Sequence, residues 1–145
     1  FALVDTGLRW HVRAFDRKSG EFRDFVVTRI EAPILLDEEP KANERSDNDI
    51  QWTRIVELDL VPHPRFARPE VIKMDYGMTN GSIKMRVRAA VVGYMLLHWS
   101  VDCSPDHRLK EEQYRLWLSD PLVLYGVESA KLAPGYQALS SSKES

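Results

Sequence analysis

Arginine, histidine and aromatic side chains are concentrated in one short stretch near the start of the 145-residue chain. Arginine binds phosphate through two parallel hydrogen bonds, and aromatic rings stack on nucleobases. Such a stretch predicts a site for a nucleotide-like anion. We expect its arginines to bind phosphate, a phenylalanine to stack, and a histidine to donate a hydrogen bond or gain charge at mildly acidic pH. The candidate site residues are His11, Arg13, Arg23, Phe25 and Arg29.

Two strands joined by a tight turn are predicted to hold these side chains. Residues 9–16 alternate between polar and apolar types, and residues 21–30 do so less strictly, which is typical of strands with two different faces. The segment 18–20, Lys-Ser-Gly, fits a three-residue hairpin loop whose glycine takes the left-handed conformation. This loop predicts that Arg17 pairs with Glu21.

In that register the hairpin has two distinct faces, and Arg13 lies opposite Phe25. One face is predicted to pack on a core and holds Trp10, Val12, Ala14, Phe22, Val26 and Ile30. The other face gathers positive charge around apolar side chains and holds Arg9, His11, Arg13, Phe15, Arg23, Phe25, Val27 and Arg29. A ligand-binding surface and a solvated basic face both fit this pattern. A slip of one residue would mix the two faces.

Several runs of residues follow one another in a set order along the chain. They are Trp10-His11-Val12, Arg13-Ala14-Phe15-Asp16, Phe22-Arg23-Asp24-Phe25, Thr28-Arg29-Ile30, Val61-Pro62-His63-Pro64, Asp75-Tyr76-Gly77-Met78 and Arg86-Val87-Arg88-Ala89-Ala90. Over roughly residues 1–126 they resemble the WYL domain of bacterial transcriptional regulators and its C-terminal extension, called WCX. The resemblance points in particular to the WYL repressors that sit beside phage-defence operons. His11 and Val12 depart from the Trp-Tyr-Leu run that names the family.

The resemblance implies an α+β fold in two parts: a partial Sm-like or SH3-like β-barrel in residues 1–32, and a small α+β sandwich of the WCX type in residues 52–126. It implies a homodimer in which the C-terminal extension reaches the partner protomer. It also implies that further barrel strands and an N-terminal winged-helix domain precede this fragment, and that duplex DNA is bound only through that domain. We therefore expect an incomplete barrel, or strands that pair with another chain.

An acidic segment separates the two predicted parts. Residues 33–51 carry more aspartate and glutamate than lysine and arginine, and Pro40 interrupts any helix. Two interpretations are open: a solvated linker, or an acidic strap that shields the basic face when no ligand is bound. At the other end, residues 127–145 finish in a serine-rich, charged run and are expected to form a disordered tail.

Alternation and turn signals predict the elements of residues 52–126. Strands are expected over 52–61 and 82–88, a short helix over 70–76 and a largely buried helix over 89–101. Gly77 is expected to end the short helix. A further helix is predicted over 111–119 and a final strand over 122–125.

The composition narrows the class of protein. With 43% hydrophobic and 29% charged residues the chain has an ordinary globular composition. Its net charge of −2 means that any anion site must be local. No apolar run approaches the roughly 18 residues of a membrane span, and no secretory signal is present. The single Cys103 cannot form an internal disulfide, which fits a reducing cytoplasm.

No catalytic or metal site is indicated by the sequence. The possible metal ligands His11, His63, His98, His107 and Cys103 show no recognised spacing, and there is no glycine-rich phosphate loop. Cys103 with His98 or His107 is a conceivable thiol–imidazole pair, but a free cysteine after a helix is the simpler interpretation. We therefore expect neither enzymatic activity nor a cofactor.

Two functions remain open. In the first, the chain is the ligand-sensing and dimerisation portion of a regulator, and a nucleotide or short single-stranded nucleic acid on the basic face biases the dimer. In the second, it is a purely structural dimerisation module whose arginines form ion pairs across a subunit contact. The first is preferred because the arginines share a face with aromatic rings, which an ion-pair surface does not need. Binding of the effector should weaken steeply with salt.

Overall fold

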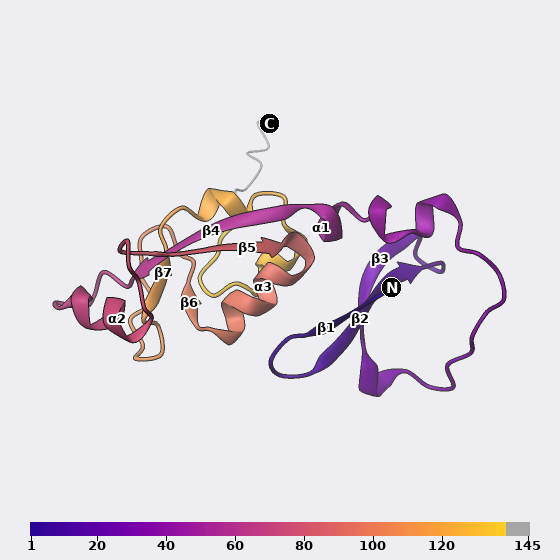
Figure 1. Ribbon diagram of the computed structural model, residues 1–145, viewed down its shortest axis with the longest axis horizontal. Helices are drawn as coiled ribbons and strands as arrows, with labels where there is room; N and C mark the ends of the chain where they lie inside the picture. The colour runs from indigo at the N-terminus through magenta and orange to yellow at the C-terminus, as the bar shows by residue number, and fades with distance from the viewer. Residues whose placement is uncertain (139–145) are drawn as a thin grey trace, which may run out of the picture.

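Two β-sheets organise the protein, and the computed structural model describes residues 1–138 (Figure 1). The first sheet is antiparallel, in the order β1-β2-β3, and consists of β1 (Ala2–Asp5), β2 (Trp10–Asp16) and β3 (Glu21–Val26). The second has four strands and lies with the helices in the C-terminal part. Neither sheet closes into a barrel within the described residues. The predicted α+β class and the absence of a closed barrel are thus confirmed.

The turn between β2 and β3 is one residue longer than the sequence predicts. Asp16 pairs with Glu21, so that residues 17–20 form a four-residue loop. Asp16 holds this loop because its carboxylate accepts hydrogen bonds from the Lys18 amide and the Ser19 hydroxyl, and its carbonyl accepts one from Gly20. Gly20 has a φ of +74°, as expected for the glycine of this turn.

The longer turn shifts the whole register of the hairpin. Arg13 pairs with Asp24 and not with Phe25, and His11 pairs with Val26. Because side chains alternate between the two faces of a strand, this shift changes which residues share a face of the hairpin. One face carries His11, Arg13, Phe15, Phe22, Asp24 and Val26, and the opposite face carries Trp10, Val12, Ala14, Arg23 and Phe25. The predicted register is therefore wrong, and with it the predicted division into a basic and an apolar face.

Burial is also opposite to the prediction. His11 and Arg13 are buried, whereas the Trp10 side chain, predicted to lie in the core, is 52% exposed. The cause is that Asp49 of the acidic segment contacts Arg13 on this face, and Tyr94 from later in the chain packs against His11. Arg29 does not lie on a strand at all, since residues Val27–Arg29 form the short 3-10 helix η1.

The acidic segment returns to the hairpin after a long irregular loop (Figure 1). It contains the 3-10 helices η2 (Ala42–Glu44) and η3 (Ser46–Asn48) and leads into the short helix α1 (Ile50–Thr53). Arg17 of the hairpin turn donates to Glu38 at 2.6 Å and to Glu44 at 2.7 Å. The segment is therefore attached to the hairpin by ion pairs.

The second sheet has the order β5-β4-β7-β6. Its strands are β4 (Ile55–Pro62), β5 (Ile83–Arg88), β6 (Val101–Asp102) and β7 (Leu116–Leu118). In β4 the buried Val56, Leu58 and Leu60 alternate with the exposed Glu57 and Asp59, as a strand with one buried face requires. The strands predicted over 52–61 and 82–88 correspond to β4 and β5, except that 52 and 53 belong to α1.

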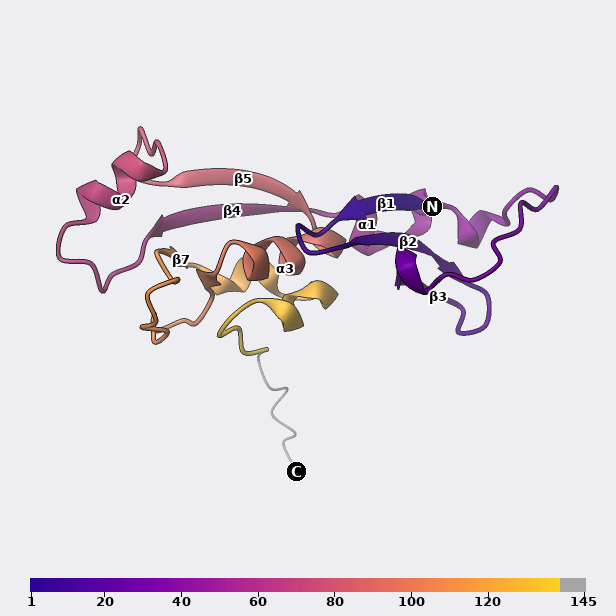
Figure 2. The ribbon, with the colours of Figure 1, turned by 90° about the horizontal axis from the view of Figure 1, so that it is seen from below.

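Two helices accompany this sheet. α2 (Pro69–Asp75) begins with proline and is followed by Gly77 at a φ of +63°, as predicted. α3 (Ala89–His98) lies against the β4–β5 pair and contributes to a common core (Figure 2). The core includes Val56, Leu58, Leu60, Val92, Leu96, Leu116, Leu118 and Leu124. No helix within residues 1–138 is both long and apolar enough to cross a membrane.

The end of the chain differs most from the prediction. Residues 111–119 were expected to be a helix, but Leu116–Leu118 form strand β7 because they pair with both β4 and β6. Residues 122–125 were expected to be a strand, but Pro121–Leu124 form the 3-10 helix η4, capped by the Asp120 carboxylate. The predicted disordered tail contains the 3-10 helix η5 (Glu128–Leu132), with buried Ser129 and Ala130. Residues 139–145 of that tail lie outside the described residues.

The helix η5 packs very closely on α3 at Gly93. The Gly93 amide donates to the Ser129 hydroxyl at 2.9 Å, and that hydroxyl donates to the Ala89 carbonyl at 2.6 Å. A Cβ atom on Gly93 would lie 1.7 Å from the Ser129 carbonyl oxygen. Glycine is therefore required at this position for η5 to reach α3.

Candidate functional site

The buried ion pair between Arg13 and Asp49 lies where the hairpin meets the acidic segment. The guanidinium donates from Nε to Asp49 Oδ2 at 2.7 Å and from Nη2 to Asp49 Oδ1 at 2.9 Å. The two residues are 36 positions apart and only 8% and 3% exposed. Asp49 directly precedes α1, so this pair joins β2 to the first turn of that helix. Such a two-bond contact is the strongest geometry available to an arginine and a carboxylate.

A second carboxylate, that of Asp24, connects three elements at the same place. It accepts a hydrogen bond from Arg13 Nη1 at 3.3 Å and one from the Tyr94 hydroxyl at 2.8 Å. Tyr94 belongs to α3, whereas the other two residues lie on β2 and β3. Burial, together with the bond to Asp24, raises the pKa of Tyr94 to about 12. The phenol is therefore protonated at neutral pH and acts as the donor.

His11 lies beneath this cluster and is 3% exposed. Its ring centroid is 4.8 Å from that of Tyr94, and Nε2 is 3.5 Å from Asp24 Oδ1 without forming a hydrogen bond. Burial lowers the pKa of His11, and Asp24 opposes that effect only in part. His11 is consequently a neutral, buried ring that packs between the hairpin and α3. It does not face solvent as a surface contact for a ligand.

A cavity of about 310 Å³ opens beside this cluster, between the hairpin, α1, α3 and η5. Three cations from three elements contribute to its wall: Arg13 from β2, Arg23 from β3 and Lys131 from η5. The remaining lining residues are Glu21, Phe22, Asp24, Gln51, Ala90, Tyr94, Glu128, Ser129 and Leu132. The cavity therefore combines positive charge, carboxylates, a phenol and an amide.

The five predicted site residues are not brought together on one face. His11 and Arg13 both lie on β2 where the hairpin meets the acidic segment and α3, which we call the junction. Arg23 lies on the opposite face of the hairpin, lines the cavity and is paired with Asp16 at 3.4 Å. Phe25 and Arg29 do not line the cavity. Three residues of the junction were not predicted, namely Asp24, Asp49 and Tyr94. Asp24 had one visible signal, since the alternation of β3 predicts this carboxylate on the same face as Phe22 and Val26, among apolar side chains.

The helix α1 links the junction to the C-terminal unit, by which we mean residues 55–132. Gln51 donates to the Gly126 carbonyl at 3.1 Å and accepts from the Glu128 amide at 3.0 Å, which holds the start of η5. Arg54, the next residue after α1, donates to the Tyr125 carbonyl at 2.8 Å. The position of η5, and of Lys131 on it, thus depends on α1.

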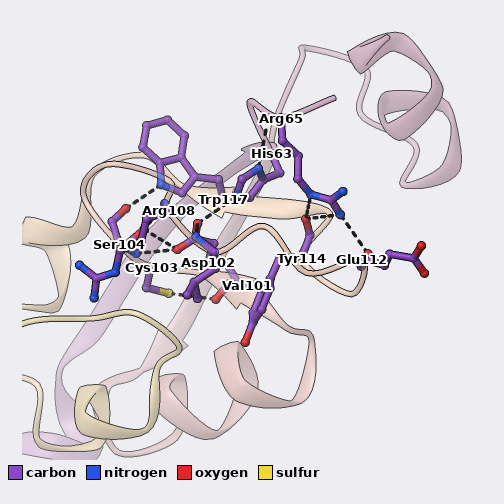
Figure 3. A network of polar contacts seen from close by, with 11 residues as sticks. His63, Arg65, Val101, Asp102, Cys103, Ser104, Arg108, Glu112, Tyr114 and Trp117 are labelled. Atoms are coloured by element: carbon purple, nitrogen blue, oxygen red, sulfur yellow. Dashed lines mark hydrogen bonds and ion pairs between the residues drawn. The ribbon is translucent and has the colours of Figure 1, made fainter. Parts of the chain in front are cut away.

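A second polar network lies inside the C-terminal unit and is shown in Figure 3. His63 donates from Nε2 to Asp102 at 2.9 Å, and both side chains are fully buried. The tautomer follows from the network, because His63 Nδ1 accepts from the Arg65 amide. Asp102 also accepts bonds from Ser104 and from the Leu109 amide. Burial alone would raise the pKa of Asp102, but these hydrogen bonds together lower it.

This second network orders the loop between β6 and β7. Trp117 donates to the Ser104 carbonyl at 2.8 Å, and Arg65 donates to the carbonyls of Glu112 and Tyr114 (Figure 3). Burial raises the pKa of the Cys103 thiol, whose Sγ donates to the Val101 carbonyl at 3.5 Å. Since its donors and acceptors are used internally, we interpret the network as structural. Within residues 1–138 no three His, Cys, Asp or Glu side chains are arranged to hold a metal ion.

Comparison with known proteins adds independent information about the C-terminal unit. Residues 55–124 match the family described as "BrxR transcriptional regulator, C-terminal dimerization domain". The matched range runs from the first residue of β4 to the last residue of η4 and includes the whole second sheet. It does not include the hairpin or the acidic segment.

The chain is also similar to proteins described as "DNA-binding transcriptional repressor CapW". The protein from Escherichia coli (strain KTE188) is 32% identical over 112 residues, which cover 76% of this chain and 36% of the repressor. The protein from Pseudomonas aeruginosa is 35% identical over 103 residues, 70% of this chain and 33% of the repressor. The protein from Stenotrophomonas maltophilia is 33% identical over 103 residues, with 70% and 34% covered.

The chain spans about a third of the length of these curated relatives. Its four-stranded unit is similar in sequence to the C-terminal dimerisation domain of BrxR regulators, and about three quarters of the chain to a part of DNA-binding transcriptional repressors.

Proposed function

We propose that this chain is the dimerisation and effector-responsive part of a bacterial transcriptional regulator. The match of residues 55–124 to a dimerisation domain carries the proposal. The matched range contributes most of the hydrophobic core, through β4, β5, β7 and α3, and Val127, Ala130 and Ala133 complete that core. A unit of this kind is suited to hold two copies of a regulator together while other parts bind DNA and ligand.

Sedimentation equilibrium of the whole chain at micromolar concentration tests the dimer directly. We expect a mass of twice the 16.7 kDa of one chain. Since the Arg13–Asp49 and Tyr94–Asp24 contacts are made within one chain, the mass should stay the same in Arg13→Ala. A single-chain mass throughout the micromolar range would contradict the proposal.

DNA binding is proposed to reside in another part of the same regulator. Two observations support this division: the repressors to which the chain is similar are about three times as long, and the chain itself carries a net charge of −2. The resemblance of residues 1–126 to WYL repressors and the similarity to BrxR and CapW support a regulator of a phage-defence operon. An electrophoretic mobility shift with operator DNA should therefore fail with residues 1–145 alone and succeed with a regulator that carries a DNA-binding domain.

Effector sensing is the second element of the proposal and is supported by the cavity at the junction. Arg13, Arg23 and Lys131 contribute three positive groups to the wall of one partly open cavity, which also carries carboxylates. A nucleotide or the end of a single-stranded nucleic acid fits this chemistry. The alternative is a purely structural module, in which Arg13 serves only its ion pairs. Binding of a short oligonucleotide that weakens steeply with salt would favour sensing over the alternative.

A further inference from the structure

We propose that two copies of this chain meet through one face of α3, where Val91, Met95 and Trp99 of each copy pack in antiparallel order against the same residues of the other. The inference rests on the dimer proposed above and names the surface that forms it. Three features support it: the apolar surface that α3 leaves uncovered, the spacing of the residues on it, and the charges on the competing edge of the sheet.

Helix α3 has more apolar surface than one chain covers. Residues 89–101 contain no Asp, Glu, Lys or Arg, although 29% of the residues in the chain are charged. A helix that is apolar on all sides is expected to be buried on all sides. Nevertheless Leu97 is 42% and Trp99 53% exposed, and Val91 and Met95 are only partly buried. Within residues 1–138, part of the apolar surface of α3 is therefore left without a cover.

Three of these side chains form one stripe along the helix. Val91, Met95 and Trp99 follow one another at intervals of four, which places them on one face. Trp99 continues the helical spacing, because its amide donates to the Met95 carbonyl at 3.0 Å. The stripe lines a hollow of about 390 Å³ between α3 and residues 5–7. Leu97, two residues from Met95, points to another side of the helix and does not line the hollow.

The spacing of the stripe matches its own reverse. About a twofold axis, residue i of one copy meets residue j of the other, and j meets i. With the axis beside Met95, antiparallel helices place Met95 opposite Met95 of the second copy and Val91 opposite Trp99. A small side chain then faces a large one at both ends, and the flexible methionine fills the centre. Rows of residues four apart also give the commonest packing between helices.

The chemistry of the stripe fits a second copy of the chain. Helix α3 lies wholly within residues 55–124, the range that matches a dimerisation domain. Tryptophan and methionine are enriched at the centres of protein interfaces, where charged residues are depleted. A nucleic acid would need cations on this face, and the stripe has none.

The free edge of the second sheet is less suited to this contact. β5 is an edge strand within the described residues, and edge strands pair readily with other chains. Its exposed side chains are Lys84, Arg86 and Arg88. Two β5 strands paired about a twofold axis at Arg86 would place Arg86 opposite itself and Lys84 opposite Arg88. Like charges directly opposite each other are destabilising, so the charges of β5 oppose pairing with a second copy.

Disulfide cross-linking of the whole chain tests the position of the axis. In Met95→Cys the two introduced thiols would face each other, so mild oxidation should yield a covalent dimer of twice 16.7 kDa on a non-reducing gel. The natural Cys103 is fully buried and does not interfere. Leu97→Cys, on another side of the same helix, is the matched control and should remain a single chain. Leu122→Cys, at an exposed apolar position of η4, tests a different surface and should also remain a single chain.

Sedimentation equilibrium tests the contribution of Trp99. In Trp99→Gln the dissociation constant of the dimer should rise at least about thirtyfold, as expected for a tryptophan at the centre of an interface. Trp10→Gln is the matched control, because Trp10 is exposed to the same extent, 52%, but lies on the hairpin. Its dissociation constant should equal that of the wild type.

Three results would overturn the inference while the wild type sediments as a dimer: equal cross-linking in Met95→Cys and Leu97→Cys, cross-linking through Leu122→Cys alone, or an unchanged dissociation constant in Trp99→Gln. Each of them would leave the proposed dimer standing and assign it to another surface. A single-chain mass of the wild type throughout the micromolar range would instead refute the dimer and this inference together.

Discussion

Tyr94 donates a hydrogen bond of 2.8 Å to Asp24 across 70 positions of the chain. This bond joins α3 of the C-terminal unit to β3 of the hairpin, and Asp24 in turn contacts Arg13. The hairpin is therefore held in place by side chains as well as by the acidic segment. Its orientation depends on a few polar groups, so single substitutions can test it.

Tyr94→Phe removes this bond and leaves the ring in place against His11. We expect the free energy of unfolding to fall by about 1–2 kcal/mol, since the partner is a charged, partly buried carboxylate. Urea denaturation followed by circular dichroism measures the change. Tyr125→Phe is the control, because the Tyr125 side chain is 67% exposed. Equal stabilities of the two variants would show that the Tyr94 bond does not hold the hairpin.

Arg13→Met leaves Asp49 buried without its partner. Removing one member of a buried ion pair costs about 3–5 kcal/mol, because the remaining charge is uncompensated. The double variant Arg13→Met/Asp49→Leu should recover most of that loss, since it leaves neither charge behind. Arg68→Met, which removes an exposed pair with Glu70, should change stability little. A double variant as unstable as Arg13→Met would contradict the conclusion that Arg13 and Asp49 form a buried ion pair.

Gly93→Ala should displace η5 from α3. The new Cβ would lie 1.7 Å from the Ser129 carbonyl oxygen, so the backbone of η5 must move. We expect a loss of about 3 kcal/mol, at the upper end for overpacking. The amides of residues 128–132 should also exchange hydrogen faster. Leu97→Ala, at an exposed position of the same helix, is the comparison and should leave η5 protected.

Because His11 is buried, we expect the stability of the protein to depend on pH. Burial lowers its folded pKa below 6.5, so in the unfolded chain it takes up a proton at a higher pH than in the folded protein. Below pH 6.5 the unfolded state therefore binds more protons, and stability falls as the pH decreases towards the folded pKa. His11→Phe should remove this part of the decline in thermal melts. His98→Asn, at an exposed position, should retain it.

Local signals in the sequence predicted the first half of the C-terminal unit well. In β4 and β5 the alternation reflects one buried face, and Pro69 and Gly77 mark the ends of α2. By contrast, β7 is a strand because of its neighbours β4 and β6, which no local pattern within residues 111–119 reveals. In the hairpin, too, the local pattern failed to predict the structure, and a single residue is the reason. Asp16 extends the turn through its side chain, and every later pair shifts with it.

The candidate site could be predicted only in part, because most of its contacts join residues that are far apart in the sequence. Arg13 was recognised from its residue type and its strand. Its partners Asp49 and Tyr94 come from other elements, and nothing near Arg13 in the sequence identifies them. Arg23 and Phe25 were placed with Arg13 by a register that proved to be shifted by one residue.

Hydrogen–deuterium exchange of the whole chain at concentrations above and below its dissociation constant tests the central claim most directly. If residues 55–124 form the dimer, amides that become protected at the higher concentration should fall within that range, and residues 1–30 should exchange alike at both concentrations. Protection confined to the hairpin would contradict the account, as would identical exchange throughout.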